Sequence, residues 1–191
     1  MARKEISIPE GISFVANVPA RMIVEVSHLL ENVEYIDMSF SDKKALFSFD
    51  RTIVSTRLVA GEYPNTKNII PRIINHTLEV KAQELIKSIE RANILSLERE
   101  NVVDLSMSED GVEIAAKSSQ VGSSQEKIDT YRYEGMPLKV SFNSEYVLAA
   151  IRALNCEDVT LAFVGEMKPF IIKNANDESV IQIVTPVRTY Y

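Results

Sequence analysis

The chain has 191 residues, 46% hydrophobic and 25% charged, a composition typical of a globular protein with a sizeable core. Its formal net charge of -6 excludes coating of nucleic acid by bulk attraction, although local basic surface remains compatible with it. No apolar run approaches the roughly 20 residues of a membrane span, and the single cysteine excludes an internal disulfide, which predicts a cytoplasmic protein with no membrane partner.

One supersecondary pattern occurs three times along the chain. The copies begin near Ser13, His76 and Lys139. Each opens with a short apolar run, enters an amphipathic helix and continues into two or three strands. Repetition at this scale predicts an α+β protein built from stacked β-α-β-β-β units.

In the first copy, Pro19 marks the start of a helix that runs to about residue 30. Strands are predicted over residues 35–40, 45–50 and 52–58, and residues 66–75 form a connector. The spacing of the apolar residues predicts one buried helix face, made of Met22, Ile23, Val26, Leu29 and Leu30.

In the second copy, a short strand at 78–80 precedes a helix. Residues 102–108 and 112–117 are predicted to form a hairpin, residues 118–127 an exposed polar loop, and residues 129–133 a further strand. The buried face of the helix is predicted to hold Ala82, Leu85, Ile86 and Ile89.

In the third copy, a strand at 138–142 leads into a helix for which Ser144 is the expected N-cap. Strands follow at 159–164, 169–173 and 180–186. The inward helix face is predicted to hold Val147, Ala150, Ile151 and Leu154.

One copy alone leaves an apolar sheet face and a helix stripe uncovered, whereas two copies related by a pseudo-twofold axis cover both. The second and third copies therefore predict a complete domain over residues 76–191. The first copy predicts an incomplete domain over residues 1–75, which pairs with another molecule or belongs to a longer chain.

No catalytic, cofactor or metal site is predicted. Cys156 has no basic neighbour that would stabilise a thiolate, so a structural cysteine is favoured over a nucleophile. His28 and His76 are far apart in sequence and belong to no cluster with metal-ligand spacing.

Four segments, in this order and spacing, resemble the beta subunit of bacterial DNA polymerase III, the sliding clamp. They are residues 57–64 (RLVAGEYP) with 69–71 (IIP), residues 91–96 (RANILS), residues 142–147 (FNSEYV) with 153–156 (ALNC), and residues 184–188 (VTPVR). The resemblance covers the second half of the middle clamp domain and the whole C-terminal domain, which implies that this chain is a fragment of a clamp.

The resemblance implies a fold and a function. Clamps have antiparallel sheets outside and helices on the inner face, form homodimeric rings around duplex DNA without reading its sequence, and are not enzymes. They tether the DNA polymerase alpha subunit, the clamp-loader delta subunit and other proteins through short peptide motifs. Because the resemblance covers only part of a clamp, we expect that this chain cannot close a ring by itself.

The resemblance also implies roles for individual residues. The DNA-facing candidates are Arg21, Lys87, Arg91 and Arg152. The alternative is that these four are ordinary solvated helix residues without a role in DNA contact. Ile94 and Leu95 match the ring interface. The peptide-binding pocket is matched by Met1, Pro64, Asn68, Ile69, Asn143, Tyr146, Met167, Thr185, Pro186, Val187 and Arg188. Without the resemblance, Pro64 and Pro186 are turn or strand-end residues and Tyr146 is a core residue.

Two other functions stay open at this point. The chain could be a structural dimerisation module with the clamp fold and no replication role, which would bind neither polymerase nor clamp-loader peptides. An enzyme is the third alternative, and it would require activity that is lost on Cys156→Ser.

Overall fold

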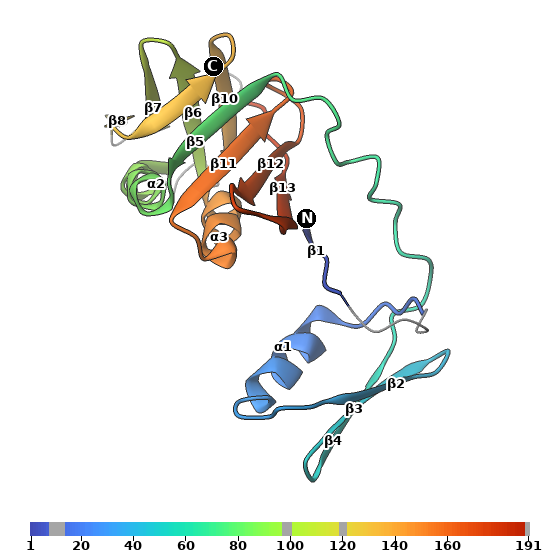
Figure 1. Ribbon diagram of the computed structural model, residues 1–191. Coiled ribbons are helices and arrows are strands. Elements are labelled where there is room, and N and C mark those ends of the chain that lie inside the picture. The colour runs from blue at the N-terminus through green and yellow to red at the C-terminus, as the bar shows by residue number, and fades with distance from the viewer. Residues whose placement is uncertain (8–13, 97–100, 119–121, 190–191) are drawn as a thin grey trace. The chain divides into compact units, whose positions relative to one another are not determined.

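The structure is a computed structural model, and it describes residues 1–7, 14–96, 101–118 and 122–189 (Figure 1). The chain divides into two compact units. The larger unit comprises Met1–Ser7 and Thr66–Tyr191, and the smaller unit comprises Ile8–Asn65. Ser13, where the first copy was expected to begin, lies outside the described residues.

The smaller unit holds one helix and one antiparallel sheet. Helix α1 (Ala20–Leu29) directly follows Pro19 and packs on the sheet β2-β3-β4, whose strands are β2 (Asp37–Phe40), β3 (Lys44–Phe49) and β4 (Thr52–Arg57). The buried cluster between them is small and consists of Val26, Ala45 and Phe47.

The predicted buried face of α1 is wrong in part. Val26 is buried, whereas Ile23 and Leu29 are 45% and 51% exposed. The periodicity correctly indicates an apolar stripe, but a single β-α-β-β-β copy offers too little surface to cover it.

The larger unit contains two sheets and two helices. Its strand orders are β1-β13-β12-β11-β5-β9 and β10-β6-β7-β8, with all neighbours antiparallel. The elements in chain order are β1 (Ala2–Lys4), β5 (His76–Lys81), α2 (Ala82–Ser96), β6 (Val102–Ser108), β7 (Gly111–Ser118), β8 (Gly122–Ile128), β9 (Tyr131–Glu134), β10 (Leu138–Asn143), α3 (Ser144–Leu154), β11 (Asp158–Phe163), β12 (Phe170–Asn174) and β13 (Asp177–Val184).

The second and third copies exchange their first strands. Strand β10 of the third copy pairs with β6 of the second, and β5 of the second copy pairs with β11 of the third. Helix α2 contacts β6, β7 and β8, helix α3 contacts β12 and β13, and the two helices contact each other. One continuous apolar core results, with Phe142, Phe163 and Phe170 among its largest fully buried side chains.

Two local predictions fail for identifiable reasons. Asn143, not Ser144, caps α3, because the Asn143 Oδ1 atom accepts hydrogen bonds from the backbone N–H groups of Glu145 and Tyr146. The Ser144 hydroxyl instead donates to Asn93 at 2.6 Å. The predicted loop at 118–127 contains most of the edge strand β8. Its polar side chains gave no strand pattern, and backbone pairing to β7 holds it in place.

Candidate functional sites

A hollow of about 560 Å³ lies between helix α3 and strand β13. On α3, Tyr146, Ala149 or Ala150, and Ala153 recur at helical spacing and so share one face. The alanines leave room for a ligand, while Tyr146 is 66% exposed and is therefore no core residue. Residues Gln182, Ile183, Val184 and Thr185 supply the opposite wall.

Met1 and Ala2 complete this hollow, since β1 lies along the edge of β13 (Figure 1). The amino group of Met1 donates to the Ile183 carbonyl at 2.7 Å, and the Ile183 N–H donates back to the Met1 carbonyl at 2.7 Å. The charged start of the sequence gave no strand signal, so β1 was missed.

The segment after β13 turns away from the hollow and runs beside β10. The Val187 N–H donates to the Ser141 carbonyl at 2.8 Å, and the Thr189 and Ser141 hydroxyl oxygens lie 3.3 Å apart. Pro186 is buried, whereas Arg188 is exposed. Only Thr185 of the predicted C-terminal rim lines the hollow.

The structure brings three of the eleven predicted pocket residues, Met1, Tyr146 and Thr185, into one hollow. Met167 is 43% exposed in the connection between β11 and β12, and Asn143 serves as the helix cap. Asn68 and Ile69 lie in the connector before β5, and Pro64 belongs to the smaller unit. For these other residues the pocket role stays a prediction, whereas the sequence missed the alanine row of α3.

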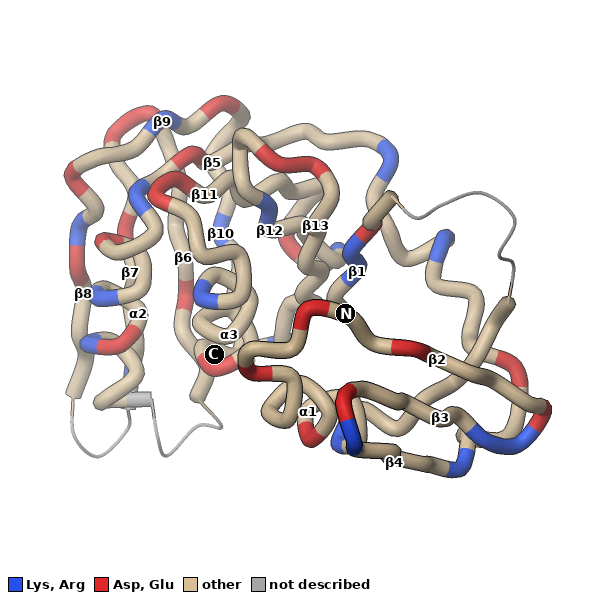
Figure 2. The backbone as a smooth tube through the Cα atoms, turned by 60° about the horizontal axis from the view of Figure 1, so that its bottom comes forward, with Lys and Arg blue, Asp and Glu red and all other residues tan. Residues whose placement is uncertain are grey.

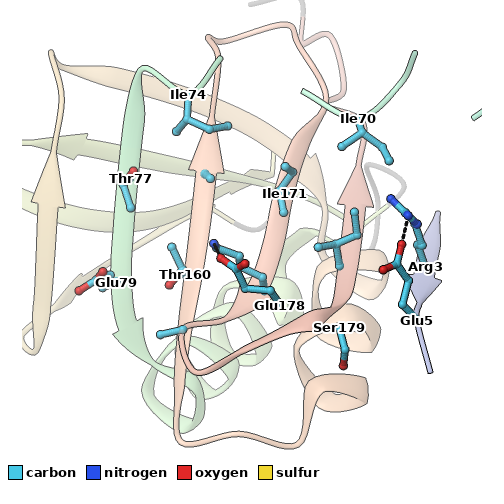
Figure 3. Close-up of a pocket in the computed structure, with 14 residues that line it drawn as sticks. Arg3, Glu5, Ile70, Ile74, Thr77, Glu79, Thr160, Ile171, Glu178 and Ser179 are labelled. Atoms are coloured by element: carbon cyan, nitrogen blue, oxygen red, sulfur yellow. Dashed lines mark hydrogen bonds and ion pairs between the residues drawn. The ribbon is translucent and has the colours of Figure 1, made fainter. Parts of the chain in front are cut away.

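A second hollow, of about 580 Å³, lies on the face of the six-stranded sheet opposite the helices (Figure 3). Ile70 and Ile74 of the connector flank it, and an Arg3–Glu5 ion pair closes one side. Thr77, Glu79, Thr160, Ile171, Glu178 and Ser179 also line it. No predicted site residue lies there, and Lys173, its other cation, already pairs with Glu178 at 3.5 Å.

The candidate DNA-facing cations differ in their surroundings. Arg91 on α2 makes a two-pronged ion pair with Glu126 of β8, with its Nε atom 2.7 and 2.8 Å from the two carboxylate oxygens. Arg152 on α3 pairs with Glu90 of α2 at 2.5 Å. Figure 2 shows basic and acidic residues side by side on α2 and β8. These pairs reduce the positive field that the two arginines offer to a polyanion.

Lys87 and Arg21 are exposed, and no ion pair to either occurs among the described residues. Lys87 lies on α2 beside Ser88 and Arg91 in a shallow polar hollow. Arg21 lies on α1 of the smaller unit. A common DNA-facing surface for the four cations stays a prediction.

The Arg91–Glu126 pair makes stability depend on pH. The Arg91 guanidinium, by hydrogen bonding, lowers the pKa of Glu126 below its usual value. A carboxyl whose pKa is lower in the folded state stabilises the fold above its unfolded pKa and loses that effect as the pH falls through its folded pKa. We therefore expect Glu126→Gln to be less stable than the unmodified chain at pH 7, and the difference to vanish in acid.

Urea unfolding followed by circular dichroism across a pH series measures this difference. Glu166→Gln is a suitable control, because Glu166 lies in the connection between β11 and β12 and makes no ion pair among the described residues. A Glu126→Gln deficit that stays constant with pH would contradict the role of the pair.

The two ring-interface candidates, Ile94 and Leu95, differ in their exposure. Ile94 is 69% exposed near the end of α2, whereas Leu95 is partly buried and packs against the core. Only Ile94 therefore offers a large apolar surface to a partner. Contact of either residue with another subunit stays a prediction.

Cys156 and His76, which were considered as a nucleophile and a metal ligand, both make contacts within the fold. Burial raises the pKa of the Cys156 thiol, which donates to the Asp158 carbonyl. Nδ1 of His76 lies 3.1 Å from the Tyr133 hydroxyl. In the part of the chain that the structure describes, no three His, Cys, Asp or Glu residues gather in a way that could hold a metal ion.

Comparison with known families decides the relationship. The family model described as DNA polymerase III beta subunit, C-terminal domain, matches residues 67–188, and the model for the central domain matches residues 1–65. The chain belongs to the DNA polymerase III beta subunit family. This confirms the resemblance seen in the sequence.

Individual sliding clamps agree with this assignment. The chain is 33% identical to the beta sliding clamp of Bacillus subtilis over 100% of its length and 51% of the relative, and 35% identical to that of Staphylococcus aureus over 91% and 46%. The crystal structure of the Bacillus subtilis sliding clamp matches with a TM-score of 0.91, 33% identity and coverage of 99% and 51%. The α+β clamp fold is therefore confirmed.

The chain spans about half the length of the curated sliding clamps it matches. The two clamp family models meet at residues 65–67, where the smaller compact unit also ends. The sequence-based domain limits, 1–75 and 76–191, stay a prediction. None of the described helices is long and apolar enough to cross a membrane.

Proposed function

We propose that this chain is a part of a sliding clamp, a non-catalytic processivity factor that tethers proteins to DNA. The observation that carries the proposal is the hollow between α3 and β13 in a chain of the clamp family. Its walls combine apolar side chains with a few polar groups, as in sites that capture short peptides. We place the protein in the cytoplasm, where a clamp meets chromosomal DNA.

The hollow would bind short apolar motifs of the polymerase alpha subunit and the clamp-loader delta subunit. The alanines of α3 would accept the bulky side chains of the motif, and Tyr146 would cover them at the rim. The Gln182 amide and the Thr185 hydroxyl are the polar groups that can orient a peptide backbone.

Contact with DNA would be topological and independent of sequence. The net charge of -6 and the ion pairs of Arg91 and Arg152 leave little unpaired positive charge on these helices. A ring that surrounds a duplex needs no tight phosphate contacts, and we propose that such a ring forms only with clamp segments beyond those in this chain.

Peptide capture tests the proposal. A fluorescent peptide with Gln followed by Leu and Phe is expected to bind with micromolar affinity, about -8 kcal/mol. Ala153→Glu should weaken binding by about tenfold or more, because it places a charge in the apolar hollow without disturbing the fold, Ala153 being exposed. Fluorescence anisotropy gives both affinities.

The matched control is Ala175→Glu, which introduces the same charge at an exposed alanine in the other hollow. Met167→Glu and truncation after Val184 test the pocket residues implied by the resemblance, and both are expected to abolish binding. Equal affinities of the unmodified chain and Ala153→Glu would reject the hollow as the site. A complete failure to bind would favour the dimerisation module.

A further inference from the structure

Two polar side chains of the larger unit are buried outside its apolar core. Asp104 of β6 and Ser141 of β10 are 7% and 8% exposed and lie directly opposite each other in the β10–β6 register. Their neighbours along the strands, Leu105, Val140 and Phe142, belong to the core. Because side chains alternate along a strand, Asp104 and Ser141 face away from that core. Buried polar groups need hydrogen-bond partners, and these two residues find them in one network.

The network runs from Lys139 to Thr189. The Ser141 hydroxyl donates to Oδ1 of Asp104 at 2.5 Å, and Nζ of Lys139 lies 2.9 Å from Oδ2 of Asp104. The hydroxyl oxygens of Ser141 and Thr189 are 3.3 Å apart. Since the single hydroxyl hydrogen of Ser141 is directed at Asp104, Thr189 is the donor in that contact. The Asp104 charge polarises both hydroxyls, and hydrogen bonds to a charged acceptor are stronger than those between neutral groups.

The network holds residues 185–189, the C-terminal segment. Ser141 bonds to this segment twice. Its backbone carbonyl accepts from the Val187 N–H at 2.8 Å, and its hydroxyl accepts from Thr189 two residues later. Val187 and Thr189 are both partly buried. Asp104 contributes indirectly, because it orients the Ser141 hydroxyl so that an oxygen lone pair is left for Thr189.

Ser141 also lies between the two walls of the α3 hollow. Helix α3 begins three residues after it, at Ser144, and β13 ends three residues before Val187, at Val184. Strand β13 belongs to the six-stranded sheet and β10 to the four-stranded sheet. The C-terminal segment therefore crosses from one sheet to the other, and Thr185, which lines the hollow, lies within that crossing. The attachment at Ser141 thus ties the β13 wall to the strand that leads into the α3 wall.

We propose that Asp104 and Ser141 are positioning residues for the α3 hollow. Both lie outside its lining. They act on the C-terminal segment, and through it they fix Thr185 and the separation of α3 and β13 before a peptide arrives. A wall that is ordered in advance loses less conformational entropy on binding, so the affinity is higher. The effect on peptide affinity rests on the proposed function, whereas the effect on the position of the segment does not.

The first test measures the attachment without a peptide. Thr189→Val removes the hydroxyl at nearly constant size, and the Val187 amide should then exchange with deuterium about two- to tenfold faster, because opening the segment breaks one hydrogen bond fewer. NMR follows this amide individually. Thr189→Ser keeps the hydroxyl and should exchange at the rate of the unmodified chain. Thr130→Val is the matched control and should not change the rate, since Thr130 is exposed in the turn between β8 and β9 and bonds to Glu84 through its backbone N–H.

The second test measures the affinity for the fluorescent peptide with Gln followed by Leu and Phe. Ser141→Ala and Thr189→Val should each raise its Kd about three- to tenfold. The double variant should bind no more weakly than the weaker of the two single variants, because both changes remove the same bond. Asp104→Asn should act in the same direction, since its amide oxygen accepts from Ser141 without the charge that strengthens the bond. Thr189→Ser should bind like the unmodified chain, a rescue that a general loss of stability does not produce.

Three results would overturn the inference. Unchanged Val187 exchange in Thr189→Val is the first, because the segment would then not depend on this hydroxyl. Affinity losses of Ser141→Ala and Thr189→Val that multiply in the double variant are the second, since they would be two independent effects. The third is faster Val187 exchange with an unchanged peptide Kd, which would separate the segment from the hollow. If the unmodified chain binds no peptide, the proposed function is rejected, and Val187 exchange alone then decides whether Asp104 and Ser141 position the segment.

Discussion

Phe170→Ala is expected to lower the free energy of unfolding of the larger unit by about 3–5 kcal/mol. Phe170 is fully buried on β12, and its ring centre lies 4.9 Å from that of Phe163 on β11 and 6.0 Å from that of Phe142 on β10. The three rings belong to both sheets of the unit. Truncation would open a cavity where the two sheets meet, so the loss exceeds that of removing a peripheral methyl group.

Urea unfolding monitored by circular dichroism measures the effect. Ile94→Ala is the control, since Ile94 is 69% exposed and its truncation should change stability by less than about 0.5 kcal/mol. Phe170 also lies opposite Val184 in the β12–β13 register, so the variant should weaken peptide binding in the α3 hollow. A change in stability below about 1 kcal/mol would show that the packing of the two sheets does not depend on this contact.

Gly135→Ala is expected to cost roughly 2–5 kcal/mol of stability. Gly135 lies in the turn between β9 and β10 with φ at +141°, a conformation that residues with a Cβ rarely adopt. A Cβ there would lie 2.5 Å from Nδ1 of His76 and 3.1 Å from the backbone oxygen of Asn75. Neither neighbour moves easily, because His76 is within hydrogen-bond distance of Tyr133 and the Asn75 N–H bonds to Phe163.

Gly122→Ala separates the two causes of this loss of stability, the backbone strain and the clash with His76. Gly122 has φ at +120° and no atom within 4 Å of the added Cβ, so this variant carries the backbone strain alone. The difference between the two urea midpoints then reports the clash with His76. Identical midpoints would show that His76 and its neighbours give way without cost.

The helices and most core strands were predictable because local pattern and tertiary burial agree there. Strand β6 has the expected bounds, since alternating apolar residues match its single buried face. Strands β1 and β8 were not predictable, because both are edge strands with polar or charged sequences that long-range backbone pairing holds in place. Asn143 was missed as a cap because Ser144, one residue later, is an equally good cap type.

The candidate site was predictable only through resemblance. Tyr146 and Thr185 were matched by motif and do share a hollow, but Ala149 and Ala153 were not, since small residues on a helix carry no chemical signal. The small side chains of these alanines leave the volume of the hollow free. That volume is recognised only from the structure, in which β13 forms the opposite wall. The resemblance correctly assigned Met1 to the hollow, whereas strand β1, which holds Met1 there, was not predicted from the sequence.

The pairing of β1 with β13 also sets the order of events on the ribosome. The Met1 amino group bonds to a carbonyl 182 residues further along the chain, so β1 must wait for β13, which is synthesised later. At 5–20 residues per second, that delay is on the order of ten seconds or more. Until β13 is synthesised, β1 has no strand to pair with, and the smaller unit is synthesised in full before the six-stranded sheet of the larger unit can close.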